Sequence, residues 1–215
     1  MKTVKIYRDA EMCDSPRNWD NLGTIAYKHS RYNLGEEEIS DPIEWLMEKT
    51  DISEETIYRL INAGKLPTFY CEETKNYLES KFEKDFIFLK LYIYDHSGIT
   101  ISTSSFNCRW DSGQFGYVYV SKEDVRKEYS VKRISPNLLE KVEYILNAEI
   151  VTFDQYITGE VYGFRLFDEN NEEINSCWGF YGDNWEINGI KDHLPEEVHE
   201  QLKDIEITYE DYCVY

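Results

Sequence analysis

Residues 86–121 read FIFLKLYIYDHSGITISTSSFNCRWDSGQFGYVYVS, and this stretch decides the fold. It begins with a run of aromatic and aliphatic side chains from Phe86 to Tyr94 that only Lys90 interrupts. A polar turn and a short alternating segment follow, and the stretch closes with the aromatic and β-branched run from Phe115 to Val120. This pattern predicts three strands joined by short turns. The first strand is apolar on both faces, so we expect it at the centre of the sheet.

Helical signals lie on both sides of this stretch. The pair Asp41-Pro42 is typical of a helix start, and two further helices are expected before residue 84. A long amphipathic helix is expected over residues 136–157. Further strands are expected at residues 3–7, 160–167 and 173–181. The sequence therefore predicts an α+β fold, in which a mainly antiparallel sheet carries a long packed helix and a small helical insert.

Three segments follow from this order of elements. Residues 1–40 hold the first strand and an irregular loop of the main domain, and residues 41–84 form the helical insert. Residues 85–215 form the main α+β domain, with an acidic C-terminal tail that adds a final edge strand. We expect the insert to have a minor core of its own, because apolar residues recur in it at helical spacing.

The chain of 215 residues carries a formal net charge of −19. Such a charge repels the phosphates of nucleic acids, which argues against direct binding of DNA or RNA. Two explanations stay open at this point. The charge either belongs to a solvated surface that keeps the protein dispersed, or it serves to bind a basic protein surface.

Five cysteines are widely spaced, and no two of them form a C-x-x-C pair. This spacing indicates neither a zinc ligand set nor a disulfide framework. No apolar run follows the first residues, and none reaches the length of a membrane span. We therefore expect a protein of the reducing cytoplasm that has no metal, no cofactor and no membrane contact. Its five cysteines are expected to be mostly small core residues: Cys13, Cys71, Cys108, Cys177 and Cys213.

Two polar turns hold residue types that enzymes use. Asp95 and His96 stand in the turn after the first central strand, and Asp111 stands in a second turn of sequence WDSG. Adjacent residues of a strand point to opposite faces, so Asp95 and His96 cannot readily form a catalytic pair. Neither an activated nucleophile nor a phosphate-binding or dinucleotide motif is visible. Asp95, His96 and Asp111 are therefore weak catalytic candidates, and turns that satisfy backbone groups are the simpler interpretation.

A long irregular segment runs from Arg8 to Gly35. It is rich in Gly, Asp, Asn and Ser, and long loops of this kind are often functional. Trp19 and Asp20 lie in this segment and are candidates for contacts with a partner. The alternative is structural, with aromatic side chains that pin the loop over the sheet and Asp20 accepting backbone hydrogen bonds.

Acidic side chains are dense in the predicted helical insert. Glu44, Glu48, Glu54 and Glu55 fall between its apolar positions, so we expect them to point outward. Carboxylates held on rigid helices can imitate the phosphates of a duplex and occupy a basic nucleic-acid channel. A solvated acidic face is the alternative. Under the first interpretation, these four residues contact the partner.

Three parts of the chain carry a resemblance to known proteins. They read SPRNWDNLGTIAYKHSRYNLGEE (15–37), LYIYDHSGITISTSSFNCRWDSGQFGYVYVS (91–121), and TFDQYITGEVYGFRLFD with SCWGFYGD (152–168 and 176–183). These segments resemble a largely uncharacterised family of small acidic proteins from bacteriophages and mobile elements of gut bacteria. The resemblance supplies a biological context and no catalytic residues.

This context implies a phage-encoded binding protein that inhibits a host nucleic-acid-directed defence complex, either a CRISPR effector or a restriction nuclease. The expected partner is a host protein with a basic surface, which the acidic residues would occupy by nucleic-acid mimicry. Two alternatives stay open. One is an enzyme acting on a small molecule or nucleotide signal, with Asp95, His96 and Asp111 in one cleft. The other is a phage regulatory interaction module.

Overall fold

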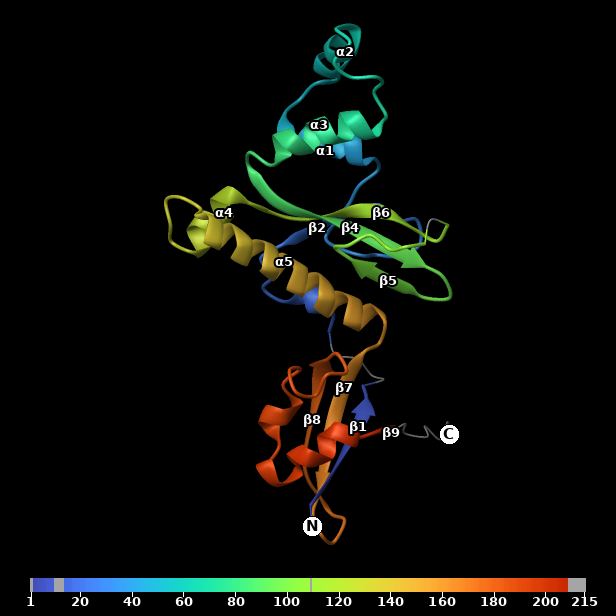
Figure 1. The fold of residues 1–215 in the computed structure, drawn as a ribbon, viewed down its shortest axis with the longest axis vertical. Helices are drawn as coiled ribbons and strands as arrows, with labels where there is room; N and C mark the ends of the chain where they lie inside the picture. Colours follow the sequence, from blue (N-terminus) through green and yellow to red (C-terminus); the bar gives the residue numbers. More distant parts are fainter. Residues whose placement is uncertain (1, 10–13, 109, 209–215) are drawn as a thin grey trace. The chain divides into compact units, whose positions relative to one another are not determined.

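The computed structural model describes residues 2–9, 14–108 and 110–208 (Figure 1). It confirms the predicted α+β class with mostly antiparallel sheets. The chain divides into two compact units. The terminal unit comprises Met1–Trp19, Gly98–Thr100 and Val151–Tyr215, and the central unit comprises Asp20–Ser97 and Ile101–Ile150.

The terminal unit is built on a four-stranded sheet with the order β8-β7-β1-β9. Strand β7 pairs antiparallel with both β1 and β8, whereas the short β9 is parallel to β1. The strands predicted at both ends of the chain are thereby confirmed. Their bounds are β1, Thr3–Arg8; β7, Val161–Phe167; β8, Glu173–Tyr181; and β9, Ile207–Thr208.

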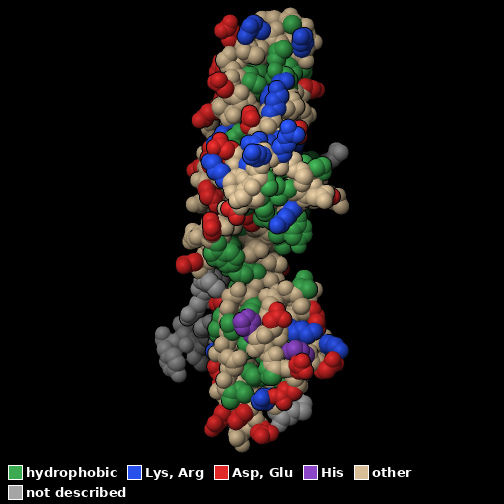
Figure 2. All heavy atoms as spheres, turned by 90° about the vertical axis from the view of Figure 1, so that its left-hand side faces the viewer, with side chains coloured by type: hydrophobic (Ala, Val, Ile, Leu, Met, Phe, Trp, Pro, Cys, Tyr) green, Lys and Arg blue, Asp and Glu red, His purple; other side chains and the backbone are tan. Residues whose placement is uncertain are grey.

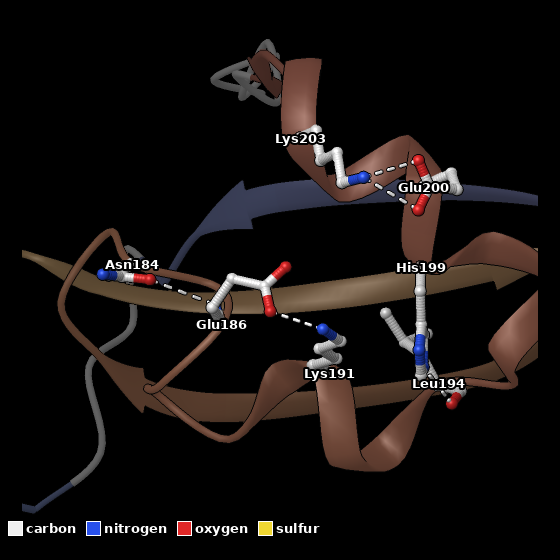
Figure 3. A network of polar contacts seen from close by, with 7 residues as sticks. All are labelled: Asn184, Glu186, Lys191, Leu194, His199, Glu200 and Lys203. Atoms are coloured by element: carbon white, nitrogen blue, oxygen red, sulfur yellow. Dashed lines mark hydrogen bonds and ion pairs between the residues drawn. The ribbon is translucent and has the colours of Figure 1, made fainter.

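One face of this sheet buries an apolar cluster that includes Ile6 and Phe164. Two 3-10 segments, η2 (Ile190–His193) and η3 (Glu196–Asp204), add Ile190 and Val198 to the same cluster. Ion pairs of Lys191 with Glu186 and of Lys203 with Glu200 lie outside it (Figure 3). His199 Nε2 is 2.9 Å from the carbonyl oxygen of Leu194 (Figure 3). Exposed pairs stabilise little, so the buried cluster holds these segments to the sheet.

The central unit contains the second sheet, with the order β3-β2-β6-β4-β5. Strand β6 pairs antiparallel with both β2 and β4, so β6 is the middle strand and β4 lies next to it. The first run, which forms β4, was expected at the centre of the sheet, but the central strand is β6. The difference arises because an additional strand, β2, forms within the segment interpreted as irregular and pairs with β6. The bounds are β2, Thr24–Tyr27; β3, Glu37–Glu38; β4, Phe86–Asp95; β5, Ile99–Ser102; and β6, Ser112–Ser121.

Helices lie on both faces of the central sheet (Figure 1). Side chains alternate along β6, so Tyr117 and Tyr119 join the core that includes Trp45 on one face. On the other face Val118 and Leu146 both lie against Gly23, where an added Cβ would be 2.7 and 2.5 Å from these side chains. The sheet is therefore packed between α1 (Pro42–Thr50) and α3 (Glu72–Phe82) on one side and α5 (Pro136–Ile157) on the other.

Capping residues set the helix starts, at Asp41 as the sequence predicts. Asp41 accepts hydrogen bonds from the backbone N–H groups of Ile43 at 2.8 Å and Glu44 at 3.3 Å. Ser53 caps α2 (Glu54–Asn62), and Ser121 caps α4 (Lys122–Glu128). Satisfying these N–H groups fixes where each helix begins.

The helical segment has no separate core, contrary to expectation. Trp45 of α1 stacks on Tyr117 of β6, with ring centroids 5.3 Å apart and planes 14° apart. Phe82 of α3 packs in the same cluster, which also contains Ala26 of β2. Residues 41–84 therefore belong to the same unit as the central sheet, and the units do not follow boundaries at residues 40 and 84.

Two further expectations concern cysteines and membranes. Cys71, Cys108 and Cys177 are free and half-buried, so they are not the core residues that we expected. Cys13, Cys213 and most of the acidic tail lie outside the described residues. No helix in the described part of the chain is both long enough and apolar enough to span a bilayer.

Candidate functional site

The four glutamates predicted to face a partner are all exposed on α1 and α2. Glu44 and Glu48 flank the buried residues Trp45 and Leu46, and Glu54 and Glu55 precede the buried Ile57. Each helix buries its apolar positions in the shared core, which turns the carboxylates outward. The outward orientation is confirmed, and the role of these residues in binding stays a prediction.

Tyr70, in the loop between α2 and α3, contacts one of these acids. Its hydroxyl donates a hydrogen bond to Glu44 Oε1 at 2.9 Å. This bond raises the pKa of Tyr70, and the negative charges of Asp41 and Glu54 raise it further. The Glu44 carboxylate of α1 therefore contacts the phenol, and Asp41 and Glu54 act on it through their charge.

Two more aromatic rings stand beside this phenol. Phe69 has its ring centroid 4.8 Å from that of Tyr70 and 5.4 Å from that of Tyr58 on α2. Tyr58 and Tyr70 are 52% and 62% exposed, whereas Phe69 packs against the core. We call this group the acidic–aromatic surface: Asp41, Glu44, Glu54, Tyr58, Phe69 and Tyr70. The sequence analysis did not single out Tyr58 or Tyr70. Tyr58 lies outside the apolar stripe of α2, which is the signal of an exposed ring, whereas Tyr70 lies in a loop and carries no such signal.

Charge is unevenly distributed over the central unit. Figure 2 shows Lys and Arg side chains gathered on the face turned to the viewer in its upper part, with Asp and Glu mostly along one margin. If acidic side chains covered this face evenly, positive and negative side chains would not be separated in this way. Segregated charge favours a partner that binds in one orientation, because complementary potentials fix the register of an interface.

The weak catalytic candidates do come together. Asp95 and Asp111 lie at adjacent ends of β4 and β6, where the Asp95 N–H donates to the Asp111 carbonyl at 2.9 Å. His96 Nδ1 is 3.4 Å from Asp111 Oδ2. The Asp95 carboxylate pairs instead with Arg31 and lies 3.8 Å from His29 Nε2. Asp95 and His96 are thus not partners, as the alternation along the strand predicts.

This cluster does not have the arrangement of an activated nucleophile. The thiol of Cys108 lies 3.8 Å from Asp111 Oδ2, so Asp111 is the shared partner of the thiol and of His96. In a Cys–His pair the imidazole itself is the base of the thiol, whereas here the thiol and the imidazole each contact Asp111. No group of three His, Cys, Asp or Glu side chains among the described residues is arranged to hold a metal ion.

A hollow of about 640 Å³ opens in the central unit, and Asp20, Lys49 and Tyr119 are among the residues that line it. Lys49 Nζ lies 3.1 Å from both Glu37 Oε1 and the Tyr119 hydroxyl, which itself donates to Glu37 Oε2 at 2.7 Å. Burial alone would raise the pKa of Glu37, but the bonds from Tyr119 and Lys49 outweigh it and lower that pKa. The pKa of Lys49 is raised, since the same bonds outweigh its burial. The three side chains therefore hold one another in place.

Neither loop candidate is a member of the acidic–aromatic surface. Trp19 makes an edge contact with Tyr181, with ring centroids 5.4 Å apart, within the terminal unit. Asp20 lines the hollow of the central unit. Tyr27 is buried, and its hydroxyl donates to Asn33 Oδ1 at 3.0 Å. Tyr27 thus pins the loop as the structural interpretation predicts.

Comparison with known proteins finds no match: no family model, no curated protein and no solved structure is significantly similar to this chain. The phage-family resemblance therefore stays a prediction.

Proposed function

We propose that this protein is a phage-encoded acidic binding protein of the host cytoplasm. It inhibits a host nucleic-acid-directed defence complex, a CRISPR effector or a restriction nuclease, by occupying a basic surface of that complex. The observation that carries the proposal is the exposure of Glu44, Glu48, Glu54 and Glu55 on two helices of the central unit. The net charge of −19 supports it.

Rigidity makes these carboxylates suitable as a mimic of phosphates. Helix α1 is capped by Asp41 and anchored by Trp45 on Tyr117, so the backbone that carries Glu44 and Glu48 is held in place. Charges fixed in place complement a basic groove better than charges on a mobile loop, because less order must be created on binding.

The test is capture of the partner from host lysate with the full-length protein, followed by affinity measurement at increasing salt. The proposal predicts a nucleic-acid-binding host protein whose affinity falls steeply with ionic strength, since exposed charges are screened beyond about 8–10 Å in ordinary buffers. An affinity that does not change between low and high salt would remove the mimicry mechanism. A partner that binds no nucleic acid would favour a regulatory interaction module.

An enzyme is the second candidate function. The observation that favours it is the convergence of His96 on Asp111 at 3.4 Å beside Asp95. Its substrate would be a small molecule or a nucleotide signal, bound where these two turns meet. Substitutions at these three positions separate the two functions, as argued in the Discussion.

A further inference from the structure

We propose that the acidic–aromatic surface binds arginine side chains of the basic partner and prefers arginine to lysine. This inference rests on the proposed function and specifies the chemistry of the contact. It goes beyond mimicry of phosphates, which would attract both cations alike.

The surface offers ring faces and carboxylates side by side. Tyr58 and Tyr70 are more than half exposed, and each lies against Phe69. Glu44 meets the Tyr70 hydroxyl at 2.9 Å. A flat cation that covers a tyrosine ring can therefore reach a carboxylate at the same time.

These groups are held before a partner arrives. Phe69 is packed against the core cluster, and the Tyr70 ring is tied to α1 by its bond to Glu44. Arg59, the basic residue that follows Tyr58 on α2, uses its guanidinium to donate a hydrogen bond to Thr56 Oγ1 at 3.1 Å. Aromatic residues with few rotatable bonds lose little entropy on binding, which suits them as anchors.

The arginine and lysine side chains differ in shape and hydration, and both properties affect how strongly each binds to the surface. Guanidinium is planar, stacks on aromatic faces and donates parallel hydrogen bonds to a carboxylate. The ammonium of lysine is compact and strongly hydrated, so it gains less from an exposed ring. Asp41, Glu44 and Glu54 provide the charge complementarity that commits the surface to a cationic partner.

The terminal unit contains an internal example of this contact. The guanidinium carbon of Arg165 lies 5.1 Å from the Tyr7 ring centroid and 5.7 Å from that of Trp178. Arg165 Nε is 3.7 Å from Glu173 Oε2. A cation over aromatic rings with a carboxylate nearby is thus an arrangement that this chain already uses. Lys49 makes the same kind of contact over Trp45 and Tyr119 beside Glu37, so the preference for arginine depends on the exposed setting of the surface and on the chemistry of the guanidinium.

The test uses two peptides of equal length and charge, one with arginine and one with lysine between glycine and serine spacers. Each is titrated into the full-length protein at low salt. We expect the arginine peptide to bind about fivefold more tightly. The double variant Tyr58→Ala/Tyr70→Ala should lose this preference, whereas Tyr58→Phe/Tyr70→Phe, which keeps the rings, should retain it.

Tyr144→Ala is the matched control, because Tyr144 is 73% exposed on α5 and outside the surface. It should leave the preference unchanged. Equal affinity for the two peptides, with both lost at high salt, would overturn the inference and leave the electrostatic function standing. A preference that persists in the Tyr58→Ala/Tyr70→Ala variant would also overturn it. Failure of both peptides to bind would contradict the proposed function together with the inference.

Discussion

The hydroxyl of Tyr117 donates a hydrogen bond to Glu79 Oε1 at 2.9 Å, and Lys90 Nζ lies 2.8 Å from Glu79 Oε2. Glu79 is only 6% exposed on α3, and Tyr117 is fully buried on β6. Burial and the Glu79 charge raise the pKa of Tyr117 far above its usual value, so the phenol remains a donor. One carboxylate thus joins α3 to strands β6 and β4, which holds the helical segment on the sheet.

Replacing Glu79 with alanine should therefore destabilise the central unit. The change leaves the buried Tyr117 hydroxyl without an acceptor and Lys90 without its counter-ion, so we expect a loss of about 3 kcal/mol in the free energy of unfolding. Urea unfolding followed by circular dichroism measures it. Glu83→Ala at the exposed end of α3 is the control and should change the free energy by less than about 0.5 kcal/mol. Equal effects of the two variants would show that the buried network contributes nothing.

Gly116 of β6 should not tolerate any side chain. A Cβ at this position would lie 2.1 Å from the carbonyl oxygen of Ala26, a backbone atom of the paired strand β2 that cannot turn aside. We expect Gly116→Ala to cost about 2–3 kcal/mol in the free energy of unfolding. Gly113 lies in the same strand with nothing within 4 Å of an added Cβ, so Gly113→Ala should be close to neutral. A thermal melt of both variants decides whether β2 and β6 approach as closely as described.

The Glu37–Lys49–Tyr119 network should make stability depend on pH in a predictable direction. The pKa of Glu37 is lowered by folding, so its contribution is complete above its unfolded value and is lost as the pH falls below about 4. Glu37→Gln should therefore flatten the decline in the unfolding midpoint between about pH 5 and pH 3. Glu38→Gln, which replaces the exposed neighbour, should leave that decline as in the wild type. An unaltered acid limb in Glu37→Gln would show that the network is not formed in solution.

At alkaline pH the same network should make the stability fall as the pH rises. The pKa of Lys49 is raised by folding, so its contribution is present below about pH 10 and is lost as the pH rises further. Lys49→Met should therefore flatten the alkaline limb of the same pH profile. A steeper alkaline decline in this variant than in the wild type would contradict the assignment.

Single substitutions in the turn cluster distinguish a binder from an enzyme. We expect Asp95→Asn, His96→Ala and Asp111→Asn to leave the inhibitory activity within about threefold of wild type. The reason is that these residues hold two turns together and take no part in the proposed binding. A general acid or base contributes about 10²–10⁴-fold. Activity is measured in an infection assay, with circular dichroism to confirm folding. A loss of about a hundredfold in a folded variant would favour the enzyme and contradict the binding function.

Local patterns in the sequence predict most of the elements. The runs at Phe86–Tyr94 and Phe115–Val120, the caps at Asp41 and Ser53, and the stripe of α5 each depend on neighbours in the chain. Strand β2 was missed because its four residues, Thr24–Tyr27, are too few to show a period. Its identity as a strand depends on pairing with β6, which is a long-range interaction.

The shared core and the candidate surface could not be predicted for the same reason. Trp45 stacks on Tyr117, which lies 72 residues later in the chain, and the hydrophobic periodicity of neither segment predicts this contact. The exposure of the four glutamates was predictable, because it follows from the helical spacing of the apolar residues between them. That Tyr70 contacts Glu44 of α1 depends on the path of a loop, which composition does not define.

The proposed role of the glutamates on α1 and α2 can be tested by charge reversal to lysine, followed by measurement of the affinity for the captured partner. The variant changes Glu44, Glu48, Glu54 and Glu55. The control variant reverses four exposed glutamates outside α1 and α2, namely Glu140, Glu172, Glu196 and Glu206, and so changes the net charge equally. Circular dichroism and thermal melting confirm the fold of both. The account predicts a loss of at least about tenfold, or 1.4 kcal/mol, for the first variant and a clearly smaller loss for the control. Binding by the first variant within about twofold of wild type would contradict it and place the interface elsewhere on the molecule.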